Sequence, residues 1–245
     1  AAVEHFVDIA GQSDAQVAQW MASQRIDIAV DIKGFAQNYR LGIFAHRPCP
    51  IQVNYLGYPG SLGAPYIDYL IADHHVIAPA DSQYYSEHLV RLPHSYQAND
   101  PLRSVTTPCP SRKALGLPDK GPGTQGFVFA CFNNSYKITP EVFAQWMAIL
   151  QATPGSVLWL LDANDQVKKH LCQHAAAHGT DPQRLVFAPR APTPQHLARH
   201  AHADLFLDTF PVNAHTTAAD ALWMGLPVLT RYGRSFSSRV ALSLL

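Results

Sequence analysis

Short apolar runs alternate with longer amphipathic stretches along the second half of the chain. The runs are typical of buried strands, and they lie at residues 127–132, 156–161, 184–188, 204–207 and 227–230. Strands that alternate with helix-length segments in this way favour right-handed βαβ crossovers. The pattern predicts an α/β fold with a parallel, doubly wound sheet.

Helix signals lie between these runs. Thr139-Pro140 has a capping residue followed by a proline suited to the first helical position, and apolar residues then recur at helical spacing up to Leu150. A second helix is predicted over 166–178, because Gly179 is a natural C-terminal stop. Three more helices are expected, one opening at Thr193-Pro194, one over 217–224 and one beginning at Ser237.

The first half of the chain has a similar but less regular pattern. Strands are expected at residues 5–9, 26–32, 52–56, 69–72 and 89–92. Ser13 and Gln16 have the spacing of a capping box at the start of a helix. Gly57-Tyr58-Pro59-Gly60 forms a turn signal directly after the 52–56 run.

A segment rich in proline and glycine separates the two halves, and its composition favours an exposed linker. We therefore expect an N-terminal Rossmann-like domain over 1–110, a linker over 111–123 and a C-terminal Rossmann-like domain over 124–245, with a ligand cleft between the domains. The first residue is not Met and the last residues stop inside an amphipathic pattern, so the chain is interpreted as an excerpt of a longer polypeptide.

Composition narrows the classes of function. The 245 residues are 47% hydrophobic and 15% charged, which is typical of a globular protein. Lys plus Arg and Asp plus Glu both number 18, so no basic excess points to nucleic acid or an anionic membrane, and an anion site has to be local. No apolar run is long enough to span a membrane, and the four cysteines are scattered, which predicts reduced thiols in the cytoplasm.

Three polar segments follow predicted strands, where ligands of parallel sheets bind. In 213–220, the hydroxyls of Thr216 and Thr217 at a helix start favour anion binding, with His215 as a further donor. The alternative is that Thr217 and Asp220 only form a capping box. Lys137 at the end of 132–137 is a candidate phosphate partner, with a solvated surface lysine as the alternative.

In the third segment, 189–199, the loop backbone suits hydrogen bonds to a base, with His196 and Arg199 facing the ligand. The alternative is an ordinary helix capped by Thr193. His170, His174 and His178 share one helix face, but no second ligand cluster supports a metal site there. The chain lacks the glycine and nucleophile motifs of dehydrogenases, P-loop proteins and serine hydrolases.

Several segments together resemble the protein O-GlcNAc transferase family, including its SPINDLY-like members, and suggest a bacterial member. They run in order through nearly the whole chain: 47–52, 54–60, 133–138, 156–161, 213–217 and 238–241. The resemblance implies a GT-B fold and metal-independent, inverting transfer of GlcNAc from UDP-GlcNAc to Ser/Thr hydroxyls of proteins, without a cofactor. It also implies tetratricopeptide repeats and acceptor-side catalytic groups upstream of residue 1.

The resemblance further implies site residues by position. Lys137 matches the lysine that neutralises the leaving diphosphate, and the other matched positions in the UDP site are Asn134, Ala191, His196, Arg199, His215, Thr216, Thr217 and Asp220. Leu56, Gly57 and Pro59 match the wall of the sugar pocket, where the missing Cβ of Gly57 suits close approach to a ligand. The chain departs from the usual pattern at Asn134 and Thr193, where the family usually has Gln and the animal enzymes have Lys.

Two other functions remain open. Related enzymes that transfer fucose or another sugar to protein share these donor motifs. A nucleotide-binding module without catalytic activity is also compatible with two Rossmann-like domains, although it would not require Lys137 or the segment 215–217.

Overall fold

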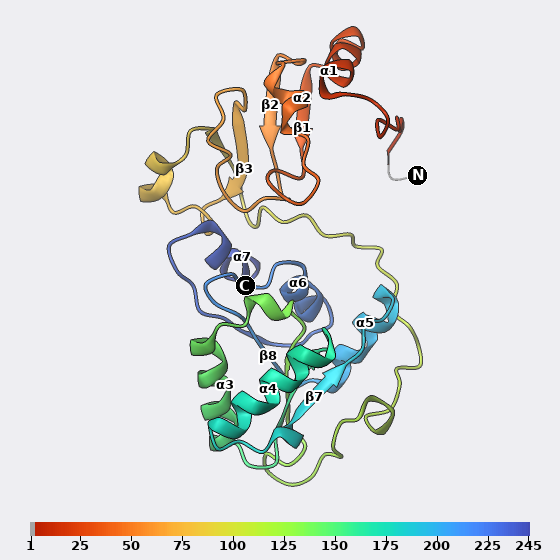
Figure 1. Cartoon of the computed structure of the whole chain (residues 1–245), viewed down its shortest axis with the longest axis vertical. Coiled ribbons are helices and arrows are strands. Elements are labelled where there is room, and N and C mark those ends of the chain that lie inside the picture. Colours follow the sequence, from red (N-terminus) through yellow and green to blue (C-terminus); the bar gives the residue numbers. More distant parts are fainter. Residues whose placement is uncertain (1–2) are drawn as a thin grey trace. The chain divides into compact units, whose positions relative to one another are not determined.

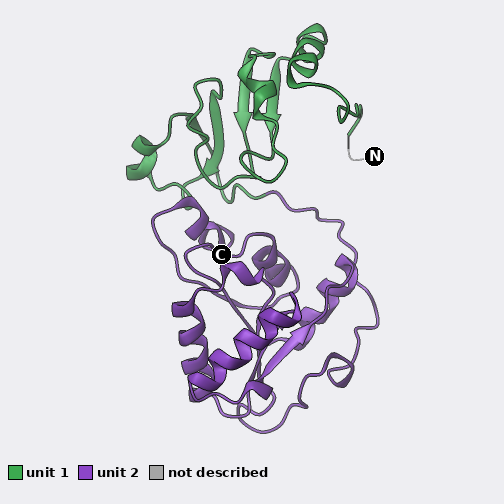
Figure 2. Cartoon of the chain, viewed as in Figure 1, with its two compact units in different colours: residues 1–97 green, residues 98–245 purple. Residues whose placement is uncertain are grey.

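The computed structural model describes residues 3–245. The chain forms two compact units, Ala1–Gln97 and Ala98–Leu245 (Figure 2). Each unit contains its own parallel β-sheet, and both sheets are of the α/β type expected from the sequence (Figure 1). Within the described residues, no helix combines the length and apolar character needed to cross a bilayer.

The sheet of the first unit has four parallel strands in chain order. They are β1 (Ile28–Asp31), β2 (Ile51–Asn54), β3 (Tyr69–Asp73) and β4 (His88–Leu92). The connecting helices are short: α1 (Asp14–Ser23) precedes the sheet, α2 (Leu41–Ala45) follows β1, and the 3₁₀ helix η1 (Pro79–Tyr84) follows β3. The predicted capping box of α1 is confirmed, since Ser13 Oγ accepts from the Gln16 backbone and Gln16 Oε1 accepts from the Ser13 backbone.

The strand predicted at residues 5–9 is wrong. These residues form no strand, and Phe6 is 83% exposed. A strand requires a neighbour that satisfies its backbone groups, and β1, the edge strand on this side of the sheet, pairs only with β2 among the described strands. The apolar alternation instead places Ile9 against Val17 and Ala18 of α1.

The sheet of the second unit has five parallel strands in the order β7-β6-β5-β8-β9. They are β5 (Val128–Cys131), β6 (Val157–Leu161), β7 (Leu185–Ala188), β8 (Leu205–Leu207) and β9 (Val228–Leu229). The chain first moves outward from β5 to β7 and then returns to place β8 on the other side of β5. This reversal creates the topological switch point at which open α/β sheets bind ligands.

The helices of the second unit follow the predicted order. They are α3 (Pro140–Ala152), α4 (Asp165–Ala177), α5 (Thr193–Arg199), α6 (Thr216–Trp223) and α7 (Val240–Leu244). Thr139 caps α3 by accepting from the Val142 backbone at 3.3 Å, and α4 ends before Gly179, whose φ is +72°. The last helix starts later than predicted, because Phe236–Ser238 forms a 3₁₀ turn, η6.

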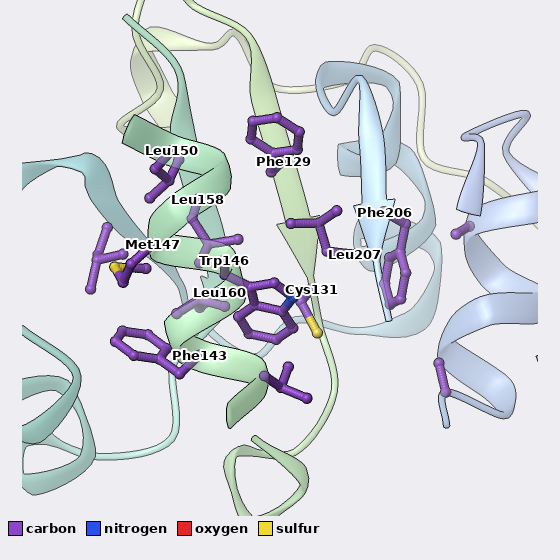
Figure 3. Packing of buried hydrophobic residues seen from close by; sticks show 14 of the residues in the cluster. Phe129, Cys131, Phe143, Trp146, Met147, Leu150, Leu158, Leu160, Phe206 and Leu207 are labelled. Carbon is purple, nitrogen blue, oxygen red and sulfur yellow. The ribbon is translucent and has the colours of Figure 1, made fainter. Parts of the chain in front are cut away.

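The core of the second unit lies between its sheet and the covering helices. Every residue of β5 is buried, as expected for a central strand of a parallel sheet. Trp146, Met147 and Leu150 of α3 belong to one buried cluster with Phe129 and the other side chains labelled in Figure 3. This packing fixes the carboxyl end of β5, where the loop leading to Lys137 begins.

The structure groups residues 98–123 with the second unit. Arg112 explains much of this attachment, since its guanidinium donates to the carbonyls of Pro118 (2.8 Å), His202 (3.0 Å) and Gly126. The Thr106 backbone also donates to the Pro194 carbonyl at 3.1 Å. The segment with the composition of a linker is therefore packed along the second unit.

Candidate functional site

A cavity of about 590 Å³ opens in the second unit at the carboxyl end of its sheet. Three loops contribute to it, following β5, β7 and β8, and these are the loops that the sequence singled out. All nine residues predicted for the nucleotide site line this one cavity: Asn134, Lys137, Ala191, His196, Arg199, His215, Thr216, Thr217 and Asp220. The predicted residues are thus brought together from positions far apart in the sequence.

Lys137 ends the 3₁₀ helix η3 (Ser135–Lys137) directly after β5. Its side chain is half-buried, and Nζ donates to the Asn213 carbonyl at 2.8 Å. Burial lowers the pKa of Lys137, and the nearby Asp208 carboxyl partly offsets this effect. The alternative of a solvated surface lysine is therefore wrong, because the ammonium is held at the cavity wall.

The loop after β8 is held by a buried carboxyl that the sequence analysis missed. Asp208 Oδ1 accepts from the backbones of Thr209 (2.7 Å) and Ala214 (2.6 Å), and Oδ2 accepts from Thr230 Oγ1 (2.6 Å). Burial raises the pKa of Asp208 to about 6, although these hydrogen bonds oppose the rise. The network fixes the loop whose Asn213 carbonyl receives the lysine.

Helix α6 starts at the cavity without a side-chain cap. Its N-cap residue is His215, and no side chain hydrogen-bonds there in the described structure. Thr217 Oγ1 instead donates to Asn133 Oδ1, and Asp220 pairs with Arg103. The capping-box alternative for Thr217 and Asp220 is wrong, so the helix start remains directed to the cavity.

His215 is neutral at physiological pH in this structure. Burial is the main reason that its pKa falls to about 4, and the Lys137 ammonium lowers it further. Its Nε2 atom is buried and has no hydrogen-bond partner within residues 3–245. A buried ring nitrogen of this kind costs free energy unless a ligand or water satisfies it.

The part of the cavity lining around α5 combines a buried arginine with aromatic rings. Arg199 is 4% exposed, its Nη1 donates to the Pro189 carbonyl at 2.9 Å, and its Nη2 has no partner in the described part of the chain. Burial lowers the pKa of His196 to about 3, with His200 and Arg199 as further causes, so its ring is neutral. The Phe132 ring lies edge-on to His196, with centroids 5.3 Å apart.

The alternative of a helix capped by Thr193 is also wrong. Thr193 is the first residue of α5, and the N-cap position belongs to Pro192, which has no side-chain donor or acceptor. Thr193 lines the cavity instead.

The cavity is strongly cationic although the whole chain has no net charge. Among the described residues that line it, Arg103, Lys137, Arg190 and Arg199 carry positive charge and Asp220 carries negative charge. Arg190 belongs to a segment that the sequence singled out, and its Nη2 donates to Asn134 Oδ1 at 3.3 Å. Arg103 had no local signal, because it was assigned to the first domain and its contacts depend on how its segment folds against the second unit.

The residues predicted for the sugar pocket lie in the first unit, in the turn after β2. Leu56 has a φ of +70°, a strained conformation for a residue with a branched side chain. The turn is fixed by Asn54 Nδ2, which donates to the Gly60 carbonyl at 3.2 Å, and by Glu87, which accepts from the Leu62 backbone at 2.7 Å. Pro59 lies between these anchors.

Contacts within the chain give a further reason for glycine at position 57. A Cβ at this position would lie 2.1 Å from the carbonyl oxygen of Ile32. Glycine is therefore required by packing of the turn against the chain itself, whatever contact the turn makes with a ligand.

His170 and His174 of α4 and His178 at its C-cap are not part of any metal-ligand cluster in the described structure. Among residues 3–245, no three His, Cys, Asp or Glu side chains lie where they could hold one metal ion together.

Comparisons with known proteins agree with the expected family. A model of glycosyl transferase family 41 matches residues 1–106 and 103–245. The chain is 39% identical to the probable UDP-N-acetylglucosamine–peptide N-acetylglucosaminyltransferase SEC of Arabidopsis thaliana and 35% identical to its SPINDLY counterpart from Oryza sativa. These matches cover 98% and 97% of the chain but 25% of each relative, so the chain spans about a quarter of their length.

Solved structures give the same result. A mutant of the O-GlcNAc transferase from Thermobaculum terrenum superposes with a TM-score of 0.86 at 32% identity, over 99% of this chain and 45% of that one. A glycosyltransferase from Rickettsia africae has a TM-score of 0.56 at 8% identity, over 92% of this chain and 64% of that one, which indicates a shared fold. The expected GT-B fold and the resemblance to O-GlcNAc transferases are confirmed, and the chain belongs to glycosyl transferase family 41.

Proposed function

We propose that this chain is the donor-binding region of an enzyme that moves GlcNAc from UDP-GlcNAc to Ser/Thr hydroxyls of proteins. One observation supports the proposal most directly: a single cationic cavity at the switch point gathers Lys137, the start of α6, the unpartnered donor Arg199 Nη2 and the unpartnered ring nitrogen His215 Nε2. The printed names of the relatives specify the same donor and peptide acceptors.

The uracil base occupies the end of the cavity near Ala191 in this proposal. Arg199 Nη2 is a buried donor without a partner among the described residues, and the carbonyl oxygens of uracil are acceptors. The neutral ring of His196, held against Phe132, offers a flat surface for the base. Recognition of the uracil base therefore depends on hydrogen bonds and ring stacking, because the base itself is neutral.

The diphosphate lies near the start of α6 and Lys137. Backbone N–H groups at the start of a helix, together with the hydroxyl of Thr216, suit phosphate oxygens, whereas the hydroxyl of Thr217 donates to Asn133 Oδ1. Asn134 lies on the same wall and contacts Arg190. Asp220, the carboxylate among the described lining residues, accepts from the ribose hydroxyls.

Lys137 acts in the chemical step. Negative charge grows on the β-phosphate as the bond to the sugar breaks, and a positioned ammonium in a partly dehydrated wall stabilises that charge. We propose transfer with inversion and without a metal, in line with the family resemblance. The turn of Leu56, Gly57 and Pro59 forms the wall of the sugar pocket, and the strained Leu56 is consistent with a functional turn.

We also propose a cytoplasmic location. The four cysteines are free thiols, and Cys49 and Cys131 are buried in the two cores. This state suits a reducing compartment.

Calorimetric titration with UDP, UDP-GlcNAc and GDP-fucose tests the donor assignment. We expect UDP and UDP-GlcNAc to bind and GDP-fucose to bind much more weakly. Tighter binding of GDP-fucose would identify the related fucosyl donor. UDP binding by a full-length protein that shows no transfer to peptides would favour a non-catalytic nucleotide-binding module.

A further inference from the structure

Arg103 enters the cavity from a segment that precedes the second sheet. Its Nη1 forms an ion pair with Asp220 Oδ1, and the two side chains are only 15% and 9% exposed. The pair joins residues 117 positions apart in the chain, so it exists only because residues 98–123 pack along the second unit.

A second contact fixes the orientation of the guanidinium. Its central carbon lies 4.8 Å from the ring centroid of Trp223, a cation–π arrangement. Asp220 and Trp223 are three residues apart on α6 and therefore share one face of the helix. Arg103 is thus held between a carboxylate and an aromatic ring of the same helix.

The ion pair uses one of the two carboxylate oxygens of Asp220, a residue that lines the cavity. Oδ1 is taken by Arg103, whereas Oδ2 lies 4.0 Å from His196 Nε2, too far for a hydrogen bond. Since the His196 ring is neutral, it does not offset the negative charge of the carboxylate. Burial raises the pKa of Asp220, and Arg103 is the partner that opposes the rise.

We propose that Arg103 is the positioning residue that keeps Asp220 a charged, correctly oriented acceptor for a ribose hydroxyl of the nucleotide. The inference rests on the proposed function, since it assigns the ribose to Asp220. An ionised carboxylate accepts hydrogen bonds only, whereas a protonated one also donates and binds a hydroxyl less strongly. Arg103 therefore determines selectivity for the ribose without touching the sugar.

Calorimetry of the whole chain with UDP, 2′-deoxy-UDP and 3′-deoxy-UDP measures this selectivity. We expect wild type to bind UDP about tenfold or more tightly than at least one deoxy analogue, the effect of one hydrogen bond to a charged acceptor. In Arg103→Met this ratio should fall to about threefold or less, and Asp220→Asn should lower it similarly. Arg103→Lys retains the cation and should recover most of the ratio.

Arg190→Met is the matched control. It removes another arginine from the cavity wall, one whose recorded contact is with Asn134 rather than a carboxylate. UDP should bind this variant more weakly because a cation is lost, but with the wild-type ratio between UDP and the deoxy analogues.

The possible results of these titrations test the positioning role, the ribose assignment and the proposed function separately. A wild-type ratio in folded Arg103→Met overturns the positioning role, and a wild-type ratio in Asp220→Asn does so even if Arg103→Met fails to fold. If wild type binds UDP without preference over either deoxy analogue, the ribose assignment is wrong while nucleotide binding stands. If wild type does not bind UDP, the proposed function is wrong and this inference falls with it.

Discussion

At the scale of single residues, Lys137 has the features of a catalytic cation. Its ammonium donates to a carbonyl of the loop after β8, which a buried Asp208 network holds in place. Burial weakens its hydration, so its field acts strongly on a nearby phosphate. In the proposed reaction, charge on the β-phosphate is larger in the transition state than in the bound donor, so we expect the lysine to stabilise the transition state more.

Lys137→Met removes the cation and retains the length and apolar bulk of the side chain. In a catalytically active form of the protein, we expect kcat to fall by about a hundredfold, or about 3 kcal/mol, with a much smaller loss of UDP-GlcNAc affinity. Steady-state kinetics and donor titration measure the two effects. Lys169→Met, which changes an exposed lysine of α4, is the control. Near-normal turnover of folded Lys137→Met would contradict the catalytic assignment.

The role of a single residue could be predicted from the sequence only where the residues next to it in the chain indicated its position. Lys137 and His215 follow strands directly, so their position at the cavity could be inferred from the strand pattern. Asp208 and Arg103 could not be recognised, because their function depends on partners brought near by folding, such as Thr230 and Asp220. The same limit explains Gly57, whose neighbour Ile32 lies on the loop after β1.

At the scale of elements, buried parallel strands were the easiest to predict. A strand such as β6 is covered on both faces, so it has a continuous apolar sequence between turn signals. The run at residues 5–9 has a similar appearance, but a strand also needs a partner strand, and sequence alone does not reveal one. The start of α7 was misplaced because Ser237 lies within a 3₁₀ turn.

The turn after β2 should be sensitive to any side chain at Gly57. Gly57→Ala should destabilise the first unit by about 1–3 kcal/mol, since the new Cβ meets the Ile32 carbonyl and the backbone has to move. Urea unfolding measures this cost. Gly60→Ala in the same turn is the control, because its Cβ would make an ordinary contact at 3.4 Å with Tyr58. Equal stability of the two variants would show that the turn has room at Gly57.

The loop after β8 should carry a pH dependence that comes from Asp208. Its folded-state pKa is raised from 3.8 to about 6, so the protonated form is favoured in the folded chain. The contribution of this group to stability is therefore largest at low pH and is lost as pH rises through about 6. Asp208→Asn keeps an acceptor for the two backbone donors, and Thr230 Oγ1 can accept from the amide.

The stability of Asp208→Asn relative to wild type should improve by about 1.4 kcal/mol between about pH 5 and about pH 7.5. Urea unfolding followed by tryptophan fluorescence measures this difference. Asp119→Asn, at an exposed site, is the control for loss of a carboxylate. A difference between Asp208→Asn and wild type that stayed constant with pH would show that this carboxyl is not the titrating group.

At the scale of the whole molecule, the order of strands explains why the site could be located from the sequence. The reversal between β5 and β8 places the loops after these strands at one edge, so motifs about 80 residues apart meet there. The extent of the second unit could not be predicted, because proline and glycine content indicates an exposed linker whether or not the segment packs. Residues 98–123 pack through the Arg112 guanidinium and bring Arg103 to the cavity.

The distribution of charge over the whole chain leads to a prediction on metal dependence. The chain has no net charge, yet the described residues lining the cavity include four cationic side chains and one carboxylate. A nucleoside diphosphate can therefore be neutralised by protein groups, chiefly Lys137, Arg190 and the start of α6, without a bridging divalent ion.

UDP should bind with the same affinity, within about twofold, in EDTA and in Mg²⁺ or Mn²⁺. Lys137→Met and Arg190→Met should each weaken binding, by up to about tenfold, under both conditions. Calorimetry in paired buffers measures these affinities. Loss of UDP binding in EDTA with recovery in Mn²⁺ would show that a metal ion, rather than these cations, holds the diphosphate.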